Sequence, residues 1–182
     1  MKQAAISTIL TFWFEEITYK QWFAKDDAFD ALLTDRFGKL VADALGGRLD
    51  GWAKTKDGTL ALILLFDQMT RNIHRNTPLA FAGDEMALAH ALNAVEKGFL
   101  DDEPTPQNTF TLMPLMHSED IAIHQKAEPI FAKYTSEMVQ ESFERHRAII
   151  ARFGHYPHRN DILGRPSSEE ERLFLTQPSS SF

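Results

Sequence analysis

The chain contains no cysteine among its 182 residues. Disulfides, thiolate zinc sites, iron–sulfur clusters and cysteine nucleophiles are therefore excluded from its chemistry. The absence of cysteine is compatible with a reducing compartment, and we expect a cytoplasmic protein.

Long apolar runs are scarce as well. The longest, LALILLF at 60–66, falls far short of the about 20 residues that span a bilayer. The apolar N-terminal segment is interrupted by Glu15 and Glu16 and has no small-residue cleavage site, so it does not resemble a signal peptide. We therefore expect no membrane association and assign the run at 60–66 to a buried helix.

Positive charge is in short supply, because the formal net charge is −7. Nucleic-acid surfaces need dense positive charge against the phosphates, so we expect no nucleic-acid partner. Nucleotide fingerprints are also missing: neither a G-x-G-x-x-G nor a Walker pattern occurs. No G-x-S-x-G elbow surrounds Ser118. The sequence therefore indicates no cofactor.

Helical periodicity is what the chain has in abundance, whereas alternating strand patterns are missing. Hydrophobic residues make up 43% and charged residues 25% of the chain, as in an ordinary globular protein. The length suits one domain. We predict an all-α fold that forms a single helical domain over residues 1–182.

Caps and stop residues delimit the expected helices. Asp26 or Asp27 begins the clearest helix, which ends at Gly46. Pro114 and Pro129 are expected to break or bend their helices. The other predicted helices run from 57 or 58 to 75, from Thr77 or Asp84 to Gly98, over 109–116, over 118–131, over 137–153, and over the residues that follow a capping box at Ser167 and Glu170.

Polar residues fall on the apolar faces of three predicted helices. An unpaired buried charge costs several kcal/mol, so each of these residues needs a partner. Asp67 can pair with Arg71 one turn later, whereas Asp120 needs a more distant cation. The polar residues on these faces are Asp67, Arg71, Asp120 with His117 and His124 beside it, and His146 with Arg147 at its boundary.

Metal binding is one interpretation of the histidines. His117, Asp120 and His124 stand at i, i+3 and i+7, and His146 is a possible fourth ligand. No H-E-x-x-H or comparable motif supports this reading, and histidines at such spacings are more often core or surface residues. We therefore predict no metal site.

Three long segments carry a family resemblance: FDQMTRNIHRNTPLAFAGD at 66–84, MPLMHSEDIAIHQ at 113–125 and HRAIIARFGHYPHRNDILGRPSSEEERLFL at 146–175. With FWFEE near the start and QPSSSF at the end, they resemble a bacterial family known only as domain of unknown function 924. The resemblance covers nearly the whole chain. It implies a tetratricopeptide-like array of antiparallel helix pairs with irregular repeats, and it brings no established activity.

The resemblance extends to individual polar positions. The chain departs from the family pattern at His155, where that pattern has an arginine. The polar residues on the apolar helix faces and the residues that match the family pattern coincide at Asp67, Arg71, His117 and His146. The matching positions are Asp67, Gln68, Arg71, Asn72, Arg75, His117, Ser118, Glu119, Gln125, His146, Arg147, Arg152, His158, Arg159, Asn160, Arg165 and Glu170.

Three functions stay open at this point. The first is a binding module whose polar groove accepts a small anionic molecule or an acidic peptide. The second is a hydrolase- or lyase-type enzyme that uses His117 or His146 with Asp120 or Glu119. The candidate ligand-binding residues are Asp67, Arg71, Arg75, His117, Glu119, Asp120, His146, Arg147, His158, Arg159, Asn160 and Arg165.

The third reading is structural: the same residues form a buried network between helices. In this reading Arg159, which follows the helix stop at Gly154, reaches inward to neutralise Asp120 or Asp67. The sequence leaves the oligomeric state open.

Overall fold

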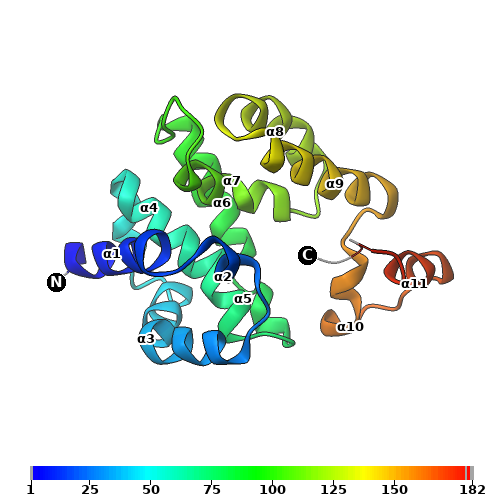
Figure 1. Cartoon of the computed structure of the whole chain (residues 1–182), viewed down its shortest axis with the longest axis horizontal. Coiled ribbons are helices and arrows are strands. Elements are labelled where there is room, and N and C mark those ends of the chain that lie inside the picture. The colour runs from blue at the N-terminus through cyan, green and yellow to red at the C-terminus, as the bar shows by residue number, and fades with distance from the viewer. Residues whose placement is uncertain (1, 179, 181–182) are drawn as a thin grey trace.

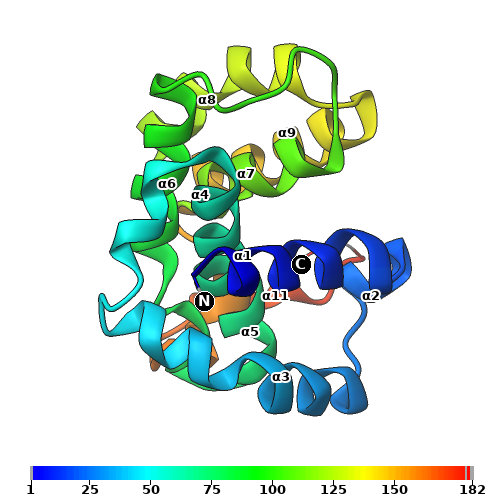
Figure 2. The same ribbon diagram turned by 90° about the vertical axis from the view of Figure 1, so that its left-hand side faces the viewer.

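The computed structural model describes residues 2–178 and 180, and this part of the chain is all-α, without a strand, as predicted. Figure 1 shows α6 and α7 near the middle of the molecule, and Figure 2 shows α4, α6 and α7 between α8 and α9 on one side and α1 and α3 on the other. The α-helices are α1 (Lys2–Thr11), α2 (Tyr19–Phe23), α3 (Asp27–Leu45), α4 (Lys56–Ile63), α5 (Thr70–Ile73), α6 (Asp84–Glu96), α7 (Pro106–His117), α8 (Ile121–Tyr134), α9 (Glu137–Phe153), α10 (Asn160–Leu163) and α11 (Glu169–Leu175).

Short 3-10 and π-helical turns join several of these helices. The π-helical turns are η1 (Phe12–Glu16) and η3 (Leu64–Met69), and the 3-10 turns are η2 (Asp50–Lys54), η4 (Pro78–Phe81) and η5 (Pro157–Arg159). No helix in the described part of the chain is both long and apolar enough to cross a bilayer.

Helix α3 begins and ends where its sequence signals predict. The carboxylate of Asp26 accepts hydrogen bonds from the backbone N–H groups of Ala28 and Phe29, which have no partner within the helix. Gly46 follows the last residue. Its inner face buries Phe29, Leu33, Phe37, Val41 and Ala44.

The predicted helix from 57 to 75 lies at the centre of the fold. It is divided into α4, the π-helical turn η3 and α5, and every residue from Gly58 to Thr70 is buried. Gly58 is required near its start, because a Cβ there would lie 2.1 Å from the carbonyl oxygen of Trp52. This central segment contributes side chains to both large core clusters.

Helices α6 to α9 follow one another as neighbours, each packed against the next. Pro114 and Pro129 were expected to break or bend their helices, and neither breaks its helix, because α7 and α8 both continue past these residues. A proline removes one backbone donor; Pro114 is buried with its neighbours in α7, whereas Pro129 is exposed.

The C-terminal segment begins at Gly154, whose φ of 75° is the left-handed conformation that ends α9. The chain then turns through η5 and α10 before α11. The capping box of α11 is formed by Ser168 and Glu171, one residue later than the predicted Ser167 and Glu170. Both pairs fit the S-x-x-E pattern, so the spacing alone does not distinguish them.

Candidate functional site

Asp67 is a fully buried carboxylate in the π-helical turn η3. Its Oδ1 accepts hydrogen bonds from Nδ1 of His117 at 2.7 Å and from Nη2 of Arg71 at 3.1 Å. Its Oδ2 accepts a hydrogen bond from Nε2 of Gln68 at 2.5 Å. Three donors therefore compensate the loss of water around this charge, and the pair with Arg71 confirms the prediction from the sequence.

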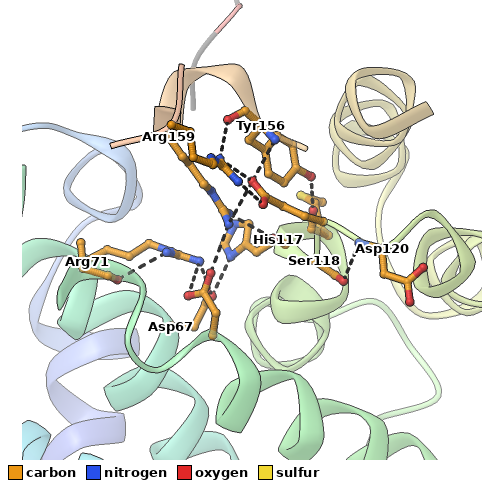
Figure 3. A network of polar contacts seen from close by, with 12 residues as sticks. Asp67, Arg71, His117, Ser118, Asp120, Tyr156 and Arg159 are labelled. Carbon is orange, nitrogen blue, oxygen red and sulfur yellow. Dashed lines mark hydrogen bonds and ion pairs between the residues drawn. The ribbon is translucent and has the colours of Figure 1, made fainter. Parts of the chain in front are cut away.

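Asp84 connects two arginines next to Asp67. Nη2 of Arg71 lies 2.9 Å from Oδ1 of Asp84, and Nη1 of Arg159 lies 3.2 Å from its Oδ2. Arg159 also donates to the carbonyl oxygen of His117 at 3.0 Å. Figure 3 shows Arg71 and His117 pointing toward Asp67, with Arg159 reaching in from the C-terminal segment. The result is a continuous network of alternating charge.

A close backbone approach places Asp84 beside this network. Gly83 is the N-cap of α6, and a Cβ at Gly83 would lie 2.3 Å from the carbonyl oxygen of Phe66. Only glycine allows α6 to begin this close to η3. Asp84 is consequently the first residue of α6, opposite the turn that carries Asp67, and the partial positive charge at the start of the helix favours its carboxylate.

Glu119 fastens the C-terminal segment to the end of α7. Its Oε1 accepts the backbone N–H of Tyr156 at 2.9 Å, and its two oxygens accept from Arg165 at 2.7 and 3.1 Å. The hydroxyl of Tyr156 donates to the carbonyl oxygen of Met116. The guanidinium of Arg159 lies between two rings, 4.7 Å from the centroid of Tyr156 and 4.8 Å from that of Phe81.

A cavity of about 260 Å³ opens between η3, α6, α7 and the C-terminal segment. Four carboxylates, one guanidinium and one imidazole contribute to its wall, and Arg71 is bonded to two of those carboxylates. The lining residues are Asp67, Asp84, Glu85, Leu88, Pro114, His117, Ser118, Glu119 and Arg159.

Burial and ion pairing act in opposite directions on these charges. Burial alone would raise the pKa of Asp67, but His117 and Arg71 hold this pKa well below its usual range. Burial would likewise lower the pKa of Arg71, and Asp67 and Asp84 raise it instead. For Arg159, burial and the neighbouring charge of Arg71 prevail, and its pKa is lowered. Arg159 is therefore a buried cation that its carboxylate partners compensate only in part.

Two of the histidines considered as metal ligands are engaged by backbone carbonyl groups instead. Nε2 of His124 lies 2.8 Å from the carbonyl oxygen of Ser118, and Nδ1 of His146 lies 2.7 Å from that of Ser142. Burial lowers the pKa of His146 to about 3, so this ring is neutral at physiological pH. Within the described part of the chain, no group of three or more His, Asp or Glu side chains is arranged to hold a metal ion.

Asp120 is not part of the site, which corrects the prediction that it is buried and paired with a distant cation. It is exposed, and its Oδ1 caps α8 by accepting the backbone N–H of Ala122 at 2.8 Å. The prediction carried one helical phase through this stretch, whereas α7 ends at His117 and α8 begins at Ile121. The expectation that Arg159 reaches Asp120 or Asp67 is also wrong, because Arg159 pairs with Asp84 at 3.2 Å and with Glu119 at 3.9 Å.

The structure brings together Asp67, Arg71, His117, Glu119, Arg159 and Arg165 from the predicted set. His146 lies behind them, with its ring centroid 6.2 Å from that of His117, and His158 lies 5.5 Å from the ring of Tyr156. The remaining predicted residues have other partners: Arg75 pairs with Asp30 of α3, Arg147 pairs with Glu144 at 2.8 Å on the outside of α9, and Asn160 donates to Ser167 and Glu171.

Sequence reasoning missed Asp84, Glu85 and Tyr156. Asp84 was identified only as a possible helix start, because an acidic residue in the first turn is already explained by the helix dipole. Its position directly after Gly83, inside the same matching segment as Asp67, is a signal that could have identified it.

Comparisons with known proteins place the chain among proteins of unknown function. The model of a family described as "Bacterial protein of unknown function (DUF924)" matches residues 9–179. Among solved structures, the chain is similar to ATU0120, a protein of unknown function from Agrobacterium tumefaciens, with 36% sequence identity and a TM-score of 0.90 over 96% of this chain and 98% of that chain. No curated protein matches the chain.

Proposed function

Because the chain belongs to the DUF924 family of bacterial proteins of unknown function, which brings no activity with it, we propose a function from its cavity: the protein binds a small molecule through an anionic group. The observation that carries the proposal is the pair of guanidinium groups, Arg71 and Arg159, that meets one carboxylate at the cavity wall.

Asp84 indicates which chemistry the two arginines accept. Its carboxylate bridges them at 2.9 and 3.2 Å and is itself partly exposed, with 24% of its side chain accessible. A carboxylate or phosphate oxygen of a ligand would meet the same donors if the side chain of Asp84 turned outward. Since burial lowers the pKa of Arg159, an added anion would also stabilise its charged form.

The size of the cavity favours a small molecule over an acidic peptide. A water molecule takes about 30 Å³ in the liquid, so a cavity of about 260 Å³ holds roughly nine groups of that size. A molecule the size of an amino acid fits this space, whereas only the end of a peptide would enter it.

At the level of the fold, we further propose a tetratricopeptide-like array for α6 to α9. The sequential packing of each of these helices on the next supports this reading, and such arrays commonly bind ligands on their inner surface. The lack of cysteine also favours a cytoplasmic location.

Titration of the protein with acetate and with phosphate at constant ionic strength tests the proposal. We expect Arg159→Gln to weaken binding of the preferred anion at least about tenfold, which corresponds to about 1.4 kcal/mol. Arg147→Ala, which removes an arginine on the outside of α9, is the matched control and should leave binding unchanged. Equal binding by both variants would reject this site. Loss of stability in Arg159→Gln without any anion binding to the wild type would favour the purely structural reading.

A second candidate function, acid–base catalysis, rests on the hydrogen bond between His117 and Asp67. An ionised carboxylate only accepts, so Nδ1 of His117 carries the hydrogen, and Nε2 is left to meet a ligand in the cavity. The carboxylates first considered for this role are unsuited to it, because Asp120 lies outside the site and Glu119 is engaged by Arg165.

His117→Gln separates this candidate from simple binding. If the protein is an enzyme of the hydrolase or lyase type, activity in a substrate panel should disappear in His117→Gln while anion binding at the arginines persists. Activity that survives the substitution would exclude His117 as the acid or base.

A further inference from the structure

The cavity wall carries more negative charge than its arginines balance. Four carboxylates line it, and three guanidinium groups pair with them. These carboxylates exceed the three guanidinium groups by one negative charge, and a bound simple anion would add another. The carboxylates are those of Asp67, Asp84, Glu85 and Glu119, and the guanidinium groups are those of Arg71, Arg159 and Arg165.

Glu85 is the lining carboxylate to which none of these arginines is paired. Arg71 pairs with Asp67 and Asp84, Arg159 with Asp84, and Arg165 with Glu119. Glu85 is exposed and stands in the first turn of α6, directly after Asp84. It is therefore an unneutralised acidic group at the cavity, next in sequence to the carboxylate that bridges the arginines.

We infer that the ligand is a small zwitterion, with one carboxylate and one ammonium group in a molecule the size of an amino acid. This inference rests on the proposed function. The ligand carboxylate takes the place of the Asp84 carboxylate between Arg71 and Arg159. The ammonium group then lies against Glu85 and the displaced Asp84. Because a zwitterion adds no net charge, the cavity gains two ion pairs without any increase in its negative surplus.

A titration followed by NMR chemical shifts or by calorimetry tests the inference with four kinds of probe: acetate, methylamine, glycine and the longer zwitterions β-alanine and 4-aminobutyrate. We expect at least one zwitterion to bind about tenfold or more tightly than acetate and methylamine do. Glu85→Gln should remove this advantage and leave acetate binding unchanged or slightly stronger. Glu96→Gln, which changes an exposed carboxylate at the far end of the same helix, is the matched control.

The outcomes separate the inference from the proposed function. If acetate binds in an Arg159-dependent way and no zwitterion binds more tightly, the inference is overturned and the anion site stands. A zwitterion advantage that persists in Glu85→Gln also overturns it. If methylamine binds most tightly and Arg159→Gln has no effect, both are rejected, because the cavity is then a cation site. If no probe binds, both are likewise rejected.

Discussion

The N-terminal core and the C-terminal junction of this protein are held together by different forces. Helices α1, α3 and α4 meet in a large apolar cluster that includes Phe12, Leu33 and Phe37, all almost fully buried. The segment after Gly154 has a much smaller apolar cluster, and it joins α6 and α7 through Glu119, Arg159 and other polar groups. Figure 1 shows α10 and α11 at the edge of the molecule, beyond α9.

This difference explains where the cavity lies. An apolar interface is stabilised in proportion to the area that it excludes from water, and it leaves few unsatisfied groups for a ligand. An interface of paired charges keeps donors and acceptors that a ligand can exchange. The polar junction should consequently respond to pH, to ions and to small molecules, whereas the apolar core should not.

The largest expected effect comes from the apolar core. Phe37 is 1% exposed, and its ring packs 4.9 Å from that of Phe12. We expect Phe37→Ala to lower the free energy of unfolding by about 3–5 kcal/mol, since it loses apolar burial and leaves a cavity. Leu32→Ala in the same helix, where the side chain is 42% exposed, should cost less than about 1 kcal/mol. Urea unfolding measures both. Similar losses in the two variants would contradict the assignment of Phe37 to the core.

A smaller effect is expected from acid at the junction. In the unfolded chain a histidine takes up a proton near pH 6.5, at about its ordinary pKa. Burial lowers the pKa of folded His146 to about 3. Between these pH values the unfolded state binds more protons than the folded state. The contribution of the neutral His146 ring to the free energy of unfolding is therefore fully present above about pH 6.5 and is lost as the pH falls. At pH 5 the loss amounts to about 2 kcal/mol at most.

Unfolding of the wild type and of His146→Leu over this pH range provides the measurement. The variant should show a shallower decline in stability, because one titrating group is gone. NMR of the wild type should show a neutral His146 ring at pH 5. The same pH dependence in both proteins, or a charged ring in the folded state, would contradict the prediction.

The parts of the fold that were predictable depend on neighbours in the sequence. Asp26 caps α3 through N–H groups two and three residues away, so the signal and the structure are local. Asp67 and Arg71 were also predictable as a pair, because residues four apart share a helix face even across the π-helical turn. The prediction that Asp120 is buried was wrong, because the break between α7 and α8 resets the helical phase on which that prediction relied.

The rest of the site depends on contacts between distant parts of the chain. Arg159 and Asp84 are 75 residues apart, and their pairing requires both the turn after α9 and the close approach at Gly83. Neither feature leaves a periodic pattern in the sequence. The list of inward-facing polar residues therefore identified Asp67, Arg71 and His117 but could not select Asp84, the carboxylate that bridges the two arginines.

The smallest losses in the free energy of unfolding are expected at two arginine–glutamate pairs, Arg165–Glu119 and Arg147–Glu144, whose distances are similar. Arg165 donates to Glu119 at 2.7 Å and to the carbonyl oxygen of Tyr156 at 3.2 Å, whereas Arg147 lies 2.8 Å from Glu144 and 3.7 Å from Glu128, two more exposed carboxylates. We expect Arg165→Ala to cost about 1–2 kcal/mol, because it leaves a half-buried carboxylate with fewer donors. Arg147→Ala should cost about 0.5 kcal/mol or less. Denaturant unfolding at low and high salt tests the contrast, and only the Arg147 effect should vanish in high salt, since water and ions screen that pair. Equal losses would mean that the C-terminal segment is held by its small apolar cluster and not by its charges.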